Sequence, residues 1–169
     1  MNKLFPFLFA LGACGGSEKA ASDMVTSAMM DETTKVEYRY GDASVAPDFH
    51  RSYNISITEN EKSITIDCYG DVLLTKQYSN TQAEFLAFRG ELSKKGIKKH
   101  KEKYSNGCSG GTTEAIRLYK NNATLFDAYV YHCSGDNGTL FLPDGTADLI
   151  RSQIPESVES LIDSTLQNN

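Results

Sequence analysis

The chain has 169 residues, of which 40% are hydrophobic, a length and composition that suit one globular domain and exclude the disordered class. Its 17 Lys and Arg residues are outnumbered by 22 Asp and Glu residues, and the net charge of −5 argues against nucleic acid as a general partner. The sequence has no run of about 18 apolar residues, so no segment predicts a membrane-spanning helix.

The first residues of the chain predict a secretory signal peptide. Lys3 precedes the apolar stretch of residues 4–11, and the small residues Gly12 and Ala13 follow it. This stretch is about half as long as a stable membrane span. Residues 1–13 are therefore expected to be removed by cleavage.

Leu11-Gly12-Ala13-Cys14 resembles a bacterial lipobox. The resemblance implies that Cys14 carries acyl chains such as palmitate and becomes the first residue of a membrane-anchored mature protein. It also implies a location in the bacterial cell envelope, on the periplasmic or the surface face. The whole chain resembles the small lipoproteins of bacterial envelopes, a resemblance that carries over no activity. Residues 14–35, which include the lipidated cysteine, are small and polar and predict a flexible tether.

Residues 36–169 predict a single α+β domain with a disulfide-stapled antiparallel meander sheet of about five to seven strands and helices packed on one face. Alternation of apolar and polar residues is typical of half-buried strands, and the short turns between them require antiparallel pairing. The expected strands cover residues 36–40, 53–57, 64–68, 72–78, 114–120, 124–132 and 139–142.

The clearest helix signal follows the fourth expected strand. Thr81-Gln82-Ala83-Glu84 matches a capping box, and Phe85, Phe88 and Leu92 then share one helical face. Two shorter helical patterns are expected near the C-terminus, over residues 149–154 and 158–166.

Cys108 and Cys133 predict a disulfide. Each is followed by Ser-Gly, and the two flank one expected hairpin. A hairpin turn at residues 121–123 places Cys133 opposite residue 111, close enough to Cys108 for a bridge, which an oxidising compartment would preserve. Cys68 is expected as a free thiol on the inward face of its strand. Pairings that involve Cys68, or no bridge at all, remain alternatives.

Gly107-x-Ser109-x-Gly111 matches the nucleophile-elbow pattern of serine hydrolases. That motif needs a strand before the serine and a helix after it, whereas this loop precedes an expected strand. The three histidines are scattered, and no residues have the spacing of a metal site. We therefore predict a protein with no catalytic residue, metal or cofactor, and serine hydrolysis stays the least favoured alternative.

The charge of the chain is most uneven in one short segment, where six lysines are opposed only by Glu102. These are Lys94, Lys95, Lys98, Lys99, Lys101 and Lys103. They could be a solvated helix end and an edge strand whose charges block sheet-to-sheet pairing. They could instead form a binding patch for anionic headgroups or an acidic partner. A second candidate surface consists of side chains expected to point away from the core, Arg117, Tyr119, Tyr129 and Tyr131.

These features together predict a monomeric, lipid-anchored envelope protein that binds an envelope component or a protein partner and is not an enzyme. The alternative is an enzyme inhibitor or protective factor that presents the loops around Cys108 and Cys133.

Overall fold

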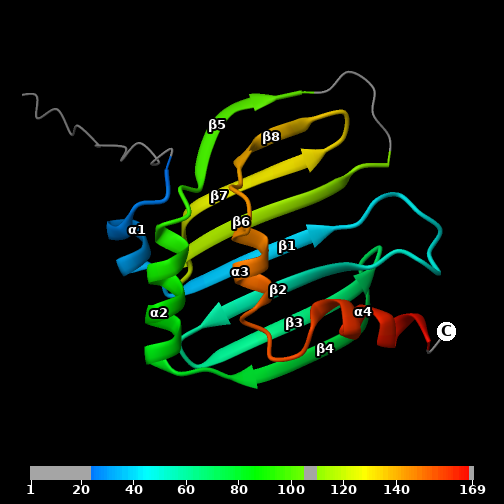
Figure 1. Ribbon diagram of the computed structural model, residues 1–169, viewed down its shortest axis with the longest axis horizontal. Helices are drawn as coiled ribbons and strands as arrows, with labels where there is room; N and C mark the ends of the chain where they lie inside the picture. Colours follow the sequence, from blue (N-terminus) through cyan, green and yellow to red (C-terminus); the bar gives the residue numbers. More distant parts are fainter. Residues whose placement is uncertain (1–23, 105–109, 168–169) are drawn as a thin grey trace, which may run out of the picture.

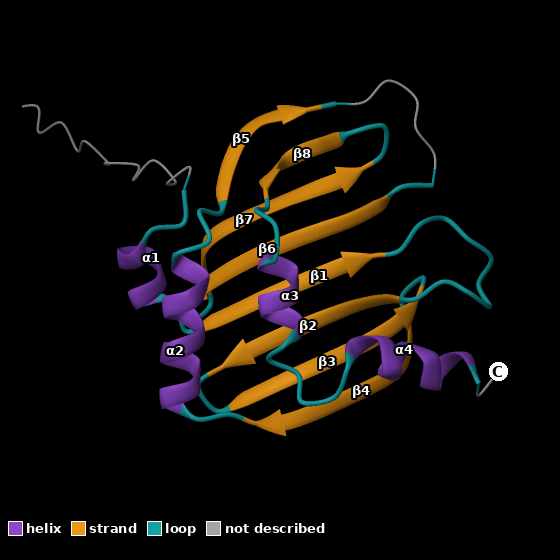
Figure 2. Cartoon of the chain, viewed as in Figure 1, coloured by secondary structure: helices purple, strands orange, loops and turns teal. Residues whose placement is uncertain are grey.

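The computed structural model describes residues 24–104 and 110–167, and every structural statement below refers to them. In this part of the chain, an eight-stranded antiparallel sheet carries four helices on one of its faces (Figures 1 and 2). The expected α+β class is confirmed, with one strand more than the range predicted from the sequence.

The strands are β1 (Lys35–Gly41), β2 (Ser52–Thr58), β3 (Glu61–Cys68), β4 (Asp71–Ser79), β5 (Lys98–Lys103), β6 (Thr112–Lys120), β7 (Ala123–His132) and β8 (Asp136–Phe141). The helices are α1 (Ser27–Glu32), α2 (Gln82–Ser93), α3 (Thr146–Arg151) and α4 (Val158–Leu166).

The strand order β4-β3-β2-β1-β6-β7-β8-β5 departs from a simple meander. Strands β1 to β4 form one meander and β6 to β8 form a second, and β1 and β6 join the two in the middle of the sheet. Strand β5 lies at the far edge beside β8 (Figure 1). It is absent from the strands expected from apolar alternation, because its lysines show none, but an edge strand was one of the two interpretations of this lysine segment.

The core lies between the sheet and its helices. Alternating residues of the central strands, such as Ile55 and Ile57 in β2, are buried. They share one core with Phe85, Phe88 and Leu92 of α2 and with apolar residues of α3 and α4. The expected capping box of α2 is present, since the Thr81 hydroxyl accepts from the Glu84 amide and the Glu84 carboxylate accepts from the Thr81 amide.

The domain begins earlier than the sequence predicts. Val25 and Met30, expected in the tether, are buried in the core, and Thr26 caps α1. Met24 forms a bridge with Lys98 at the start of β5. Residues 24–35 therefore belong to the folded domain because their apolar side chains complete its core, whereas Cys14 and the expected signal peptide lie outside the described residues.

Within the described ranges, no helix has the length and hydrophobicity needed to cross a membrane.

Candidate functional site

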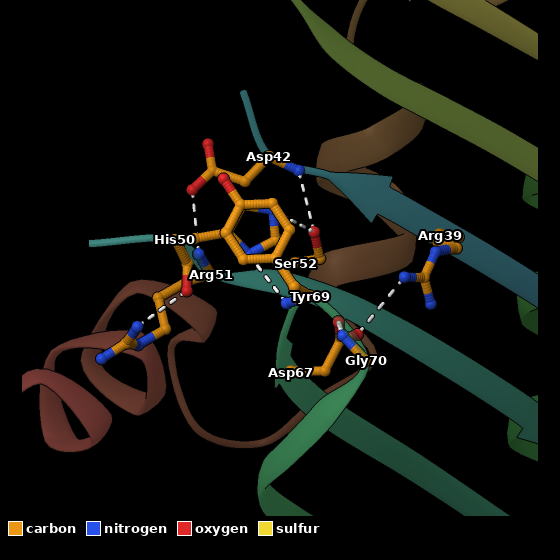
Figure 3. Close-up of polar contacts among 8 residues, drawn as sticks. All are labelled: Arg39, Asp42, His50, Arg51, Ser52, Asp67, Tyr69 and Gly70. Carbon is orange, nitrogen blue, oxygen red and sulfur yellow. Dashed lines mark hydrogen bonds and ion pairs between the residues drawn. The ribbon is translucent and has the colours of Figure 1, made fainter. Parts of the chain in front are cut away.

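The loop between β1 and β2, residues 42–51, is longer than the two to five residues usual in a hairpin. Its two ends are held together by Asp42 (Figure 3). The Asp42 carboxylate accepts hydrogen bonds from the amides of Ala43, at 2.8 Å, and Arg51, at 2.9 Å. The Asp42 amide donates to the hydroxyl of Ser52 at 3.0 Å. One side chain therefore fixes the base of the loop.

Arg51 ties this loop to the C-terminal helix. It is only 3% exposed, and its guanidinium donates to the Thr165 hydroxyl at 2.7 Å and to the Thr165 carbonyl at 3.2 Å. It also donates to the carbonyl oxygens of His50, at 2.7 Å, and Pro47, at 3.2 Å. These acceptors are all neutral, so the guanidinium acts here as a rigid, multivalent donor.

His50 and Ser52 lie together like a catalytic histidine and serine, but the hydrogen bond between them runs in the wrong direction for catalysis. The imidazole stacks on the ring of Tyr69, with the ring centroids 3.7 Å apart. The Tyr69 amide donates to Nδ1 of His50 at 3.2 Å, so Nδ1 bears no hydrogen and Nε2 carries it. Nε2 faces the Ser52 hydroxyl at 3.4 Å, as a donor. A general base must face its serine with a lone pair, so this histidine cannot activate Ser52.

The turn between β3 and β4 supports the loop from the other side. The Asp67 carboxylate accepts from the Gly70 amide at 2.9 Å and lies 3.4 Å from the Arg39 guanidinium. Tyr69 and Gly70 both have positive φ, and the Asp67 bond stabilises this turn. The Tyr69 hydroxyl in turn donates to the Val45 carbonyl of the loop.

A group of apolar side chains is exposed above this polar network. Phe49, at the end of the loop, is 69% exposed. Val45 in the same loop is also exposed, as are Tyr69 and Val72 at the supporting turn. We call Val45, Phe49, Tyr69 and Val72 the apolar tip. Single exposed apolar residues are ordinary, but several on two mutually braced loops form a candidate binding surface.

Sequence reasoning missed this site. The available signals were the length of the connection between two clear strands and the apolar Val45 and Phe49 within it. Its polar bonds could not be inferred, because the residues that brace the loop come from distant parts of the chain. Arg51 and Thr165, for example, are 114 positions apart.

The lysines expected to form one patch are divided by the structure. Lys94 lies at the end of α2 and pairs with Glu91 at 2.7 Å. Within β5, the ammonium of Lys98 lies over the ring of exposed Phe141, whereas that of Lys99 lies over the ring of buried Phe126. The strand therefore distributes its lysines over both faces of the sheet edge.

The lysines of this segment nevertheless share one property. Each described lysine before or after it forms an ion pair with a carboxylate, namely Lys35, Lys62, Lys76 and Lys120. In the segment, Lys94 is paired as well. The remaining five have no carboxylate partner among the described residues: Lys95, Lys98, Lys99, Lys101 and Lys103. This sheet edge therefore carries uncompensated positive charge.

The outward Tyr and Arg residues form a paired network instead of one patch. Arg117 pairs with Asp127 at 3.1 Å, and the Tyr119 hydroxyl donates to Glu37 at 2.9 Å. Partial burial raises the pKa of Glu37, but hydrogen bonds from Lys35 and Tyr119 and the nearby cations outweigh it, so the pKa is lowered overall. Tyr129 donates to Glu102 of β5. These groups largely satisfy one another.

The cysteines differ from expectation at one position. Cys68 is free, as expected, but it is half-exposed at the end of β3, where its thiol donates to the Pro47 carbonyl of the loop. Cys133 is buried and disulfide-bonded, although no disulfide joins two cysteines of the described ranges. The pairing of Cys108 with Cys133 stays a prediction, because Cys108 lies outside the described residues, as does Ser109.

In the described part of the chain, no three His, Cys, Asp or Glu side chains are placed to hold a metal ion. Comparison of the sequence and the structure with protein-family models, curated proteins and solved structures gives no match.

Proposed function

We propose that this protein is a lipid-anchored protein of the bacterial cell envelope that works by binding a protein partner and not by catalysis. The apolar tip is the binding surface in this proposal. The observation that carries it is the contrast between an exposed tip, with Phe49 at 69%, and the buried hydrogen-bond network beneath it.

A braced loop suits binding for an energetic reason. Ordering a loop at an interface costs free energy, and a loop already held by its own hydrogen bonds avoids much of that cost. Aromatic side chains contribute most to protein interfaces because they bury a large area with few rotatable bonds. Phe49 and Tyr69 are such side chains, and the stack of Tyr69 on His50 fixes its ring.

The direction of the hydrogen bond between His50 and Ser52 supports a role without catalysis. A hydrolase built on this pair would need the imidazole to accept the serine proton, whereas the Tyr69 amide occupies the only lone pair of the neutral ring. Ser52 is also only 3% exposed, which keeps substrate away from its hydroxyl.

The lipid anchor and the disulfide complete the proposal. Cys14 carries the lipid, on the strength of its resemblance to a lipobox. Cys108 is then the partner of Cys133, because Cys68 is free and the thiol of Cys14 is occupied by lipid.

The role of the apolar tip can be tested by replacing Phe49 with alanine. The full-length protein would be crosslinked in native envelopes, and captured proteins would be quantified for wild type, Phe49→Ala and the control Leu86→Ala. Leu86 is a matched apolar residue, 48% exposed, on α2, and this helix lies at the end of the sheet opposite the β1–β2 loop (Figure 1). We expect one captured protein to lose affinity about thirtyfold with Phe49→Ala, the effect of about 2 kcal/mol at an interface hot spot. Equal capture by both variants would contradict the proposal.

The anchor is tested separately with Cys14→Ser. The wild-type protein should sediment with membranes and incorporate labelled acyl chains, because acyl chains supply the only strong membrane attachment proposed. The serine variant should lose the label and leave the high-salt-washed membrane fraction. A variant that retained both properties would show that the lipobox is not used.

A further inference from the structure

The N-terminal segment enters the domain directly beside the lysine-rich strand. Met24 bridges to Lys98, and the Val25 amide donates to the Ile97 carbonyl at 2.9 Å. The described chain thus begins against the start of β5 (Figure 1). An anchor attached to the N-terminal segment is therefore connected to the domain at the β5 edge of the sheet.

The covalent distance from the anchor to this edge is short. Residues 15–23 separate Cys14 from Met24, and a segment of that length spans at most about 35 Å when fully extended. If Cys14 is acylated, the tether enters the domain beside β5, whereas the other edge strand, β4, lies on the opposite side of the eight-stranded sheet.

We propose that the edge formed by β5 rests on the anionic phospholipid surface that holds the acyl anchor. This inference depends on the proposed lipid anchor and names the surface that the domain meets. The ligand is a layer of phosphate headgroups, and the contacting groups are the unpaired lysines of β5 together with Lys95.

The charge at this edge fits such a surface. Exposed cations close to an anionic membrane are attracted within about one Debye length, roughly 8 Å at physiological ionic strength. The nearby acids are already engaged: Glu91 pairs with Lys94, Asp127 pairs with Arg117, and Glu102 accepts hydrogen bonds from Tyr104 and Tyr129. The lysines without a carboxylate partner among the described residues are thus free to interact with the negatively charged phosphate groups of the membrane surface.

The apolar groups around the strand fit as well. Tyr104 directly follows β5 and is 79% exposed, and Met24 and Phe141, which flank the start of the strand, are exposed too. Lysines interspersed with exposed aromatic residues are typical of protein segments that lie at the headgroup region of a bilayer. Proximity to the N-terminus favours the membrane over an acidic protein, and protection of the sheet edge would need neither that proximity nor the exposed aromatic groups.

The experiment uses the mature chain, residues 14–169, with Cys14→Ser, so that binding reports the domain and neither the acyl chains nor the apolar signal peptide. Its binding to vesicles of phosphatidylcholine, alone or with about one third phosphatidylglycerol, would be measured by flotation at low and high salt. The test variant combines Lys98→Gln, Lys101→Gln and Lys103→Gln. The control combines Lys35→Gln, Lys76→Gln and Lys120→Gln, which removes the same charge from paired lysines elsewhere.

We expect binding only to the anionic vesicles, weakened at least about tenfold by the test variant and less than about threefold by the control. Unchanged melting temperatures would show that both variants fold. Equal weakening by the two variants, or binding without preference for anionic lipid, would overturn the proposal. The vesicle measurement does not depend on the lipid anchor, because Cys14 is replaced. The anchor itself would be contradicted by the labelling experiment, if the wild-type protein carried no acyl label.

Discussion

At the scale of single residues, Arg51 shows how a charged side chain can stabilise a loop from inside the protein. Its planar guanidinium reaches a helix residue and two loop carbonyls that neutral side chains of similar size could not satisfy together. Burial of the charge is compensated by these hydrogen bonds, so the benefit depends on all of them being kept. The apolar tip owes its position largely to this residue and to Asp42.

Arg51→Met is expected to lower the free energy of unfolding by about 2–3 kcal/mol, because methionine replaces the apolar stem but leaves the Thr165 and His50 acceptors unpaired. Urea denaturation followed by circular dichroism measures the effect. Lys120→Met, which breaks the exposed pair with Glu32, serves as the control and should change stability by less than about 1 kcal/mol. If the two variants were equally stable, the buried network would contribute nothing to the fold.

At the scale of elements, the hairpin of β6 and β7 agrees with the sequence in its register as well as in its position. The pairing of Thr112 with His132 places residue 111 opposite Cys133, as predicted. The turn is one residue shorter than the expected 121–123, since Lys120 pairs with Ala123, and the register shift between Leu118 and Tyr119 restores the expected pairing. A bridge to Cys108 would close a loop of about 26 residues and stabilise the fold by roughly 3.5 kcal/mol in the chain-entropy model.

Mass spectrometry after non-reducing digestion should therefore find one peptide pair that joins Cys108 to Cys133. Cys68 should react with a thiol reagent in the folded protein, since it is free and half-exposed. A linked peptide that contains Cys68 would contradict the proposed pairing. Reduction should lower the melting temperature of wild type but leave that of a Cys108→Ser/Cys133→Ser variant unchanged, because only the wild-type chain has this bridge to lose.

The elements predicted correctly are those with a local signature. Period-two burial identifies β2 and β3, and the Thr81 capping box identifies the start of α2. Strand β5 has no such signature, because an edge strand with lysines on both faces needs no buried stripe. The apolar tip was missed for a different reason: Asp42, Arg51 and Tyr69 acquire their roles only through partners that the tertiary fold brings near.

At the scale of the whole molecule, the two candidate surfaces occupy different parts of one rigid sheet. The apolar tip is built on the β1–β2 loop and the β3–β4 turn, in the half of the sheet that ends at β4, and the unpaired lysines of β5 lie at the other edge. A domain held to a bilayer by its β5 edge therefore keeps the tip available to a partner. Membrane contact and partner binding need not compete.

The position of β5 also has a consequence for the order in which the protein can fold during synthesis. Strands β1 to β4 can pair with their sequence neighbours as soon as each is made, whereas β5 must wait for β8, which begins only at Asp136. Until then β5 is an unpaired strand in a nascent chain, the state in which strands from different chains associate most readily. Its dense positive charge repels a second copy of itself during that interval, so the same lysines act as gatekeepers against aggregation before the sheet is complete.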